Sequence, residues 1–186
     1  MHLWYMIANI ALACGTNVGG VRHLQVIDIN DIISIPSASA SVINSEISLK
    51  AGVTPAVISF PPHAGDFSQK VKEADSGQII QSTIRVDIPK DAVEIGQWAN
   101  LNSEREVVAL YMDENGVACI VGSLERPLSM KVNRATGRKA ADNNKFDITL
   151  EGIADHYAYY YNMFELLPAG ERKVYSAGYT FGYQRT

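Results

Sequence analysis

The chain has 186 residues, of which 47% are hydrophobic and 19% charged, with a formal net charge of −4. This balance excludes wholesale disorder and argues against a coiled coil. Because no Lys/Arg cluster is large enough to neutralise many phosphates, tight binding to duplex DNA is also disfavoured. The length supports one domain with one core, and we divide it into an N-terminal arm (residues 1–20), a β-sandwich domain (residues 21–161) and a C-terminal extension (residues 162–186).

The N-terminal segment is apolar from Leu3 to Ala13 and is followed by Cys14. Its end resembles the cleavage box of a bacterial lipoprotein signal, although Asn9 interrupts it and no positive charge precedes it. We expect a buried or partner-bound arm, with a lipid-anchored protein as the alternative. Cys14 and Cys119 are too few for a disulfide framework, which favours a reducing compartment. No other segment reaches the roughly 18 to 20 apolar residues of a membrane span.

The first half of the chain predicts several strands. Residues 21–29 are rich in β-branched side chains and form the first, and residues 32–35, 46–49 and 57–60 are shorter candidates. Residues 67–73 and 78–88 predict a hairpin with its turn at residues 74–77. In the second arm of this hairpin, alternate residues share a core face: Ile80, Ser82, Ile84, Val86 and Ile88.

One helix is predicted near residues 91–101. The spacing of apolar residues changes there from two to about 3.6, after a start marked by Pro89 and Asp91.

The central feature is a hairpin at residues 106–122. Two apolar arms flank Asp113-Glu114-Asn115-Gly116, and Asn-Gly supplies the positive φ angles that suit a tight turn. Both faces of the first arm are apolar, so both must be covered. Either this strand lies in the middle of a sandwich or barrel, or its sheet packs on the chain's own core on one face and on a neighbouring subunit on the other.

The last part of the chain predicts a second hairpin and an aromatic excess. Residues 127–133 and 145–153 form the arms, with Phe146, Ile148 and Leu150 facing inward, around a polar tip. Residues 173–183 predict a last strand. The tip carries Arg134, Arg138 and Lys139, which form either a nucleic-acid-facing loop, an ion-paired contact between subunits, or a solvated surface.

Tyrosines are concentrated at residues 157–161, and tyrosine is common at protein interfaces because it buries a large area and keeps a polar group. These side chains either fill the domain's own core or join the N-terminal arm in a subunit interface. The candidates for that interface are Leu3, Trp4, Tyr5, Ile7, Tyr157, Tyr159, Tyr160 and Tyr161.

No motif points to catalysis. The histidines at positions 2, 23, 63 and 156 have no zinc-ligand spacing, and the sequence contains no P-loop, GxGxxG or GxSxG. We therefore predict no enzymatic activity, no cofactor and no metal, with a small β-barrel enzyme or ligand binder as a competing class.

The order of strands, one helix and two apolar hairpins resembles the tail-tube superfamily of tailed bacteriophages and related injection systems. The segment 14–22, the Asp-Glu-Asn-Gly hairpin and the Thr136-Gly137-Arg138 loop before residues 146–152 look like small virion proteins of phages infecting Bacteroidetes. The resemblance covers roughly residues 14–161.

The resemblance implies an antiparallel β-sandwich or barrel with one flanking α-helix and extended arms. It also implies a structural subunit of the virion tail, assembled in the host cytoplasm. Such a subunit contacts copies of itself in a hexameric ring and other tail proteins, DNA only passes through the lumen, and no membrane is involved. The resemblance implies no catalytic residues in this chain.

Overall fold

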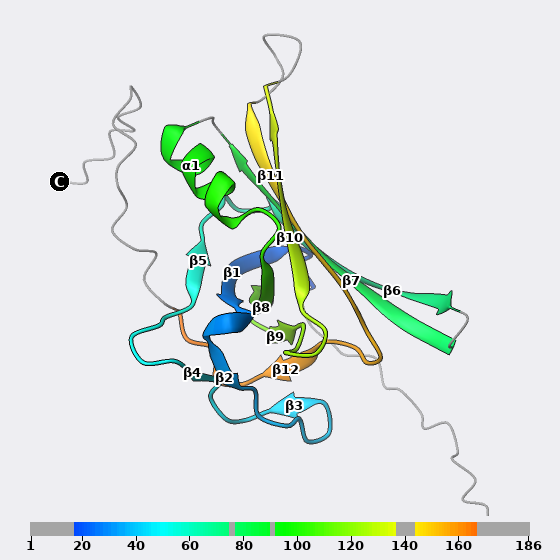
Figure 1. Ribbon diagram of the computed structural model, residues 1–186. Coiled ribbons are helices and arrows are strands. Elements are labelled where there is room, and N and C mark those ends of the chain that lie inside the picture. Colours follow the sequence, from blue (N-terminus) through cyan, green and yellow to red (C-terminus); the bar gives the residue numbers. More distant parts are fainter. Residues whose placement is uncertain (1–16, 75–76, 90–91, 137–143, 167–186) are drawn as a thin grey trace, which may run out of the picture.

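The computed structural model describes residues 17–74, 77–89, 92–136 and 144–166. The protein is mainly β, with one α-helix and a large mixed sheet folded on itself (Figure 1). Hydrogen-bonded neighbours run in the order β3-β12-β9-β8-β10-β11-β7-β6, with β1 between β8 and β5. The strands are β1 (Val21–Asp28), β2 (Ile32–Ser34), β3 (Val42–Ile43), β4 (Ser48–Leu49), β5 (Ala56–Ile58), β6 (Gly65–Ala74), β7 (Gly77–Pro89), β8 (Glu106–Asp113), β9 (Ala118–Val121), β10 (Leu128–Ala135), β11 (Lys145–Ala154) and β12 (Tyr159–Tyr161).

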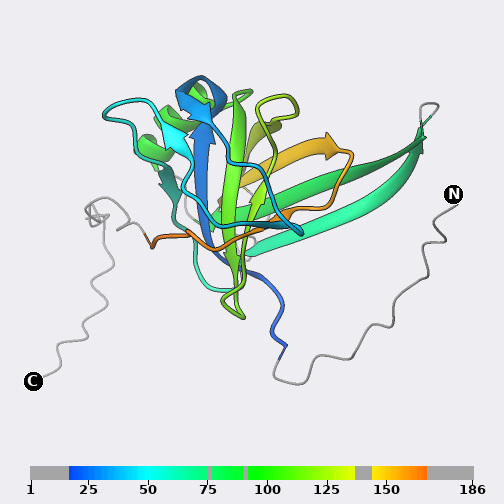
Figure 2. The same cartoon turned by 90° about the horizontal axis from the view of Figure 1, so that it is seen from below.

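The sheet bends at one corner into two layers. β10 pairs with β8 only at Leu128↔Val107 and Ser129↔Glu106, and then leaves to pair along its length with β11. The first layer is β5-β1-β8-β9-β12-β3 and the second is β10-β11-β7-β6. Figure 2 shows the strands of the two layers crossing at a steep angle, which is the orthogonal form of sandwich packing.

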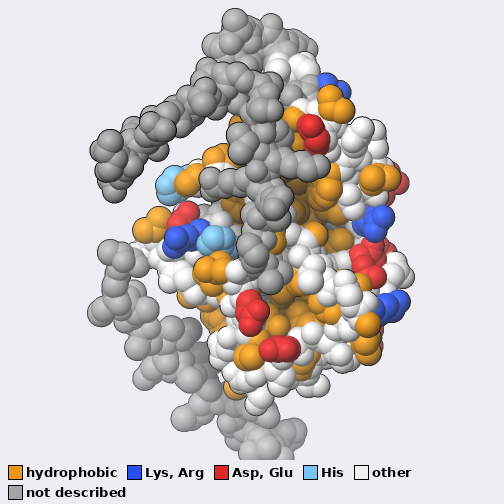
Figure 3. All heavy atoms as spheres, turned by 90° about the vertical axis from the view of Figure 1, so that its left-hand side faces the viewer, with side chains coloured by type: hydrophobic (Ala, Val, Ile, Leu, Met, Phe, Trp, Pro, Cys, Tyr) orange, Lys and Arg blue, Asp and Glu red, His pale blue; other side chains and the backbone are white. Residues whose placement is uncertain are grey.

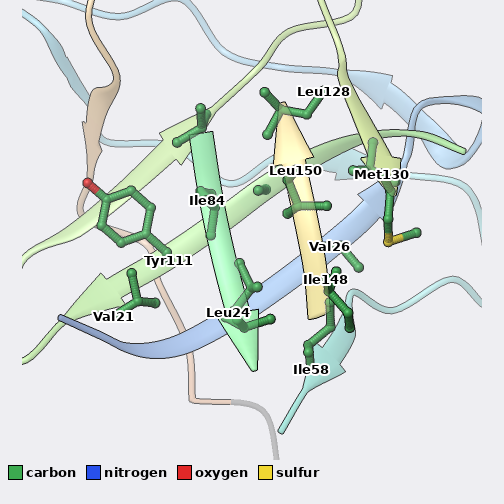
Figure 4. Packing of buried hydrophobic residues seen from close by; sticks show 14 of the residues in the cluster. Val21, Leu24, Val26, Ile58, Ile84, Tyr111, Leu128, Met130, Ile148 and Leu150 are labelled. Atoms are coloured by element: carbon green, nitrogen blue, oxygen red, sulfur yellow. The ribbon is translucent and has the colours of Figure 1, made fainter. Parts of the chain in front are cut away.

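The main core lies between these layers. Alternate residues of β7 and β11 are buried against β1 and β8, and Leu24, Ile84, Ile148 and Leu150 are fully inaccessible to solvent. Figure 4 shows side chains of β7 and β11 directed toward those of β1. The alternation predicted for residues 80–88 and 146–150 is therefore confirmed, because one face of each strand meets the opposite layer.

The outer face of the first layer is covered by the chain itself. Val108 and Leu110 of β8 pack there with Ile27, Ile43 and Tyr161. This cover comes from the β2-β4 ribbon and from the segments around β3 and β12. Val107 and Ala109 point into the main core. Both apolar faces of β8 are thus buried within one chain, so the sandwich alternative is correct and this strand does not require a neighbouring subunit.

The helix α1 (Val93–Asn102) confirms the predicted helix and lies beside the upper ends of β10 and β11 (Figure 1). Ile95 and Ala99 pack on Phe146 of β11, with Ile88 and Val132 alongside. The helix therefore closes the end of the core where β10 and β11 extend past β1 and β8. This packing fixes the helix, because ten residues alone form a marginally stable helix in water.

The turn of the central hairpin differs from the prediction in one detail. β8 and β9 pair antiparallel as expected, but only Gly116 has a positive φ, of 82°. Gly116 N donates to Asp113 O at 3.2 Å, and the Asp113 carboxylate accepts from Asn115 N and Val117 N. The loop is a type I turn closed by a glycine and an Asx interaction. Asn115 was thus wrongly expected at positive φ.

Candidate assembly surfaces

The solvent side of the second layer is a broad polar sheet surface, which we call the open face. It consists of the residues of β6, β7, β10 and β11 whose side chains point away from the core. Its charged members are nearly balanced in sign: Asp66, Lys70, Lys72, Arg85, Asp87, Lys131, Lys145, Asp147 and Glu151. Such a mixed surface stays hydrated and attracts neither sign of partner strongly.

Two cations of the open face are already paired. Lys145 Nζ lies 2.7 Å from Asp87 Oδ2, and Lys131 Nζ lies 2.9 Å from Glu151 Oε2. The hydrogen bond to Asp87 raises the pKa of Lys145 above its ordinary value. Arg85 lies between Asp66 and Thr149 in the strand register. Paired cations are weaker ligands for phosphate than isolated ones, because a phosphate must compete with the carboxylate already bound.

The second layer has two free edges among the described residues. β6 pairs with β7 on one side only. On the far edge, β10 meets β8 at Leu128 and Ser129, and Met130 exchanges backbone hydrogen bonds with residues 104 and 105. No described strand pairs on that side with Lys131, Val132, Asn133 or Ala135. The β6–β7 hairpin also reaches well beyond the rest of the molecule (Figure 1). Long free edges are templates for pairing with another chain.

The tyrosine segment, Tyr157–Tyr161, is split between core and surface. Tyr161 is 5% exposed and belongs to the outer-face cluster, where burial raises its pKa. Tyr159 packs against the same cluster and stacks on His156 at 4.2 Å. Tyr157 and Tyr160 are 59% and 51% exposed. Tyr161 is thus taken up by the chain's own core and Tyr159 is half-buried beside it, whereas Tyr157 and Tyr160 keep their rings at the surface, so the subunit interface stays a prediction.

The predicted basic loop is only partly described. Arg134 lies in β10, which continues to Ala135, and not in the loop that the sequence suggested. It pairs in register with Phe146, and its guanidinium carbon lies 6.0 Å from the centroid of the Phe146 ring. Arg134 is thus on the helix side of β10 and away from the open face. Arg138 and Lys139 lie outside the described residues, as do Leu3, Trp4, Tyr5, Ile7 and the strand predicted at residues 173–183.

A small cleft brings together groups that sequence reasoning did not connect. Its volume is about 240 Å³ and its walls include Ser123, Asp155 and His156. His156 Nδ1 lies 2.8 Å from Tyr157 O, and the Asp155 carboxylate is 3.8 Å from Nε2. Ser123 Oγ accepts from Arg126 N in its own turn. A hydrolytic triad requires the acid at one imidazole nitrogen and the nucleophile at the other, whereas here the acid occupies the side on which the nucleophile is needed.

Other chemistry has little support in the described part of the chain. No group of three or more His, Cys, Asp or Glu residues there could hold a metal ion. Cys119 is buried beside Tyr111, and burial raises the pKa of its thiol, which disfavours the reactive thiolate. Within the same residues, no helix has the length and hydrophobicity needed to cross a membrane.

Comparison with known proteins gives no relative: no family model, curated protein or solved structure matches the chain.

Proposed function

We propose that this chain is a structural subunit of a bacteriophage tail, in the tail tube or an adjacent ring, and that copies close into a ring around the channel that conducts DNA. The observation that carries the proposal is the open face with a free strand edge on either side. The resemblance in sequence supplies the biological setting, and the sheet geometry supplies a way to assemble.

The even number of antiparallel strands in the second layer favours this assembly. Its four strands are antiparallel throughout, so the two edge strands β6 and β10 run in opposite directions. When β6 of one copy meets β10 of the next, the new pair is therefore also antiparallel, which is the more frequent and slightly more stable arrangement. Because two different edges meet, the contact is head-to-tail, and such contacts close into rings when the rotation permits.

The open face suits the wall of a channel for DNA. A ring built from this layer turns either the open face or the buried face inward, and only the open face is polar and free of cover. Its balanced charges and its ion-paired lysines limit attraction to phosphate. The net charge of −4 also weakens the attraction of the protein for DNA phosphates. DNA then passes along the surface without being held.

Exposed aromatic side chains add contact area to the proposed interface. Tyr157 adjoins Ala158, whose N donates to Gln69 Oε1 of β6 at 3.2 Å, and Tyr160 follows in β12; both tyrosine rings are more than half exposed. Val71 of β6 is also half exposed. These side chains gain free energy when a neighbour covers them, at roughly 25 cal/mol per Å² of apolar area.

Cysteine cross-linking tests the edge contact directly. Lys70→Cys on β6 is combined with Lys131→Cys, Asn133→Cys or Ala135→Cys on β10, all on the open face. Within one copy these strands are three strand spacings apart, roughly 14 Å, which is beyond the reach of a disulfide, about 7 Å between Cα atoms. Oxidation should therefore link different copies and give a ladder of oligomers that ends at a closed ring.

The matched control moves the first cysteine to the central strand β7, as Arg85→Cys with Asn133→Cys, which the assembly does not bring together. Native mass spectrometry of the unmodified chain gives the ring size, and the resemblance predicts six copies of the 20.3 kDa chain. A chain that stays monomeric at high concentration and forms no cross-link at any of the three β10 positions contradicts the proposal. An intact mass that lacks residues 1–13 and includes lipid on Cys14 supports the lipid-anchored alternative.

A further inference from the structure

Two lysines on the distal half of β6 have no carboxylate partner. Lys70 and Lys72 both point to the open face, because alternate residues of a strand share a side. Both are exposed, and neither forms an ion pair among the described residues. Lys131 and Lys145 of the same face, in contrast, are each paired with a carboxylate. On the open face, the distal half of β6 is therefore basic.

The opposite edge of the second layer is bordered by acidic side chains. Residues 104 and 105 exchange backbone hydrogen bonds with Met130 of β10, and Glu106 pairs in register with Ser129. Because residues directly opposite each other in a sheet project to the same side, Glu106 lies on the open-face side of this corner. Glu104 and Glu106 are exposed, and neither has an ion-pair partner in the part of the chain that the structure describes.

The strand directions bring these two groups together when β6 of one copy meets β10 of the next. In an antiparallel pair, the distal half of β6 runs toward the start of β10, where residues 104–106 border the edge. The unpaired lysines and Glu106 are then on the same side of the joined sheet. Lys131, a cation already at that end of β10, is held by Glu151. A second copy of the chain therefore matches this acidic border in charge and in direction.

We propose that Lys72 of one copy forms an ion pair with Glu106 of the next copy, and that this contact selects the pairing of β6 with β10. Lys70 and Glu104 flank the pair. The inference rests on the proposed assembly and names the charges that orient it. Pairing of two β6 edges would instead bring lysines together, and pairing of two β10 edges would bring glutamates together, which like-charge repulsion disfavours. The charges therefore favour head-to-tail contacts over contacts between like edges.

Charge reversal in the full-length protein tests the contact, with association measured by analytical ultracentrifugation at low salt. Lys72→Glu and Glu106→Lys should each weaken association by roughly threefold to thirtyfold, because each turns an attraction into a repulsion. The double variant, which restores opposite charges, should recover most of the loss. The two single variants shift the net charge in opposite directions, so an effect of net charge alone would strengthen one assembly and weaken the other. Added salt should weaken the wild-type assembly by screening the pair.

The matched controls lie around β4, far from the β6–β7 hairpin (Figure 1). Figure 3 shows the side of the molecule that carries β4, where acidic and basic side chains are both scattered around a hydrophobic centre. Lys50→Glu and Glu46→Lys make the same changes of net charge at exposed positions there. Each control should change association by less than about twofold, because neither position borders a free edge of the second layer.

The outcomes separate this inference from the proposed function. If the wild type stays monomeric and forms no cross-link between β6 and β10, both are overturned. If the wild type assembles through that cross-linked edge but Lys72→Glu and Glu106→Lys assemble equally well, only the ion pair is overturned. A double variant that associates no better than the single variants also overturns it. Thermal unfolding of each variant should match the wild type, because the changed side chains are exposed, so a loss of association is not a loss of the fold.

Discussion

The side-chain amide of Asn115 pairs with both backbone groups of Val18: its Oδ1 accepts from Val18 N at 2.9 Å, and its Nδ2 donates to Val18 O at 2.9 Å. The Asn115 amide thus makes the two backbone hydrogen bonds with Val18 that a residue of a neighbouring strand would make. The N-terminal segment is held at the β8–β9 turn by this contact and by the bond from Glu114 N to Gly20 O. Val18 and Gly20 are therefore fixed to the domain at this turn.

Replacing Asn115 tests this attachment. Asn115→Ala removes both bonds, each worth about 0.5 to 1 kcal/mol at an exposed site, and we expect the free energy of unfolding to fall by about 1 kcal/mol. Hydrogen exchange at residues 18–20 should accelerate more than exchange in β1. Asn44→Ala serves as control, because the exposed Asn44 side chain accepts a hydrogen bond from Asn162 and makes no contact with residues 17–20 among the described residues. Unchanged exchange at residues 18–20 contradicts the assignment.

Two glycines should respond in opposite directions to alanine. Gly116 has φ of 82°, which alanine adopts at a cost of about 1 kcal/mol, so Gly116→Ala should destabilise the protein. Gly96 lies inside α1, and a Cβ there meets nothing within 4 Å. Gly96→Ala should therefore stabilise by about 0.5 to 1 kcal/mol through helix propensity. Chemical denaturation of both variants measures the change in the free energy of unfolding. If the change has the same sign in both variants, either the turn geometry or the helix is disproved.

The corner between the two layers depends on a third glycine. A Cβ on Gly152 lies 2.6 Å from Leu128 Cδ2 and 3.0 Å from Pro127 O. Leu128 is 1% exposed, and the Pro127 carbonyl is backbone, so neither group moves easily. Gly152→Ala should cost about 1 to 3 kcal/mol by overpacking. If Gly152→Ala unfolds with the wild-type midpoint in urea, the close packing at the corner is disproved.

The Asp28–Arg105 ion pair predicts a pH dependence. Burial alone raises the pKa of Asp28, but hydrogen bonds from Asn30 and Arg105 outweigh it, so the pKa lies below the ordinary value of 3.8. A carboxylate with a lowered pKa in the folded state stabilises the fold above pH 3.8, and this contribution disappears as the pH falls through the folded-state pKa. Arg105 is half exposed, which limits the contribution to about 0.5 to 1 kcal/mol.

Asp28→Asn keeps an oxygen for Asn30 but loses the charge. At neutral pH it should therefore be less stable than wild type, and the difference should vanish well below pH 3.8. Arg105→Gln should lower the free energy of unfolding by a similar amount. The double variant should lose little more, because the same interaction is removed in each case. A difference between wild type and Asp28→Asn that persists unchanged in acid shows that the charge is not responsible.

Tyr160 and Tyr161 should separate assembly from folding. Tyr160→Ser removes a half-exposed ring, so it should weaken the oligomer at least several-fold and leave monomer stability nearly unchanged. Tyr161→Ser removes a buried ring and should cost about 3 to 5 kcal/mol of folding stability. Native mass spectrometry and thermal unfolding measure the two effects. Equal oligomer populations for Tyr160→Ser and wild type exclude Tyr160 from the interface.

Local patterns in the sequence were enough to predict the long strands, the helix and the position of the central turn, but not the short strands β3 and β12. The alternation in residues 80–88 and 146–150 and the period change before α1 report which side chains face a core, and each is set by neighbours a few residues away. The same patterns showed that residues 107–112 are buried on both faces.

Only the tertiary structure decided what covers those faces, which tyrosines remain exposed and where the layers meet. Tyr157 to Tyr161 looks uniform in sequence, but Tyr161 meets the outer-face cluster while Tyr160 points to the other side of β12. Asn115 and Val18 are 97 residues apart, and Gln25 and Glu165 are 140 apart. Such contacts depend on how the sheet folds back at Leu128. Residues that come together from distant parts of the chain show no local periodicity that would predict their contact.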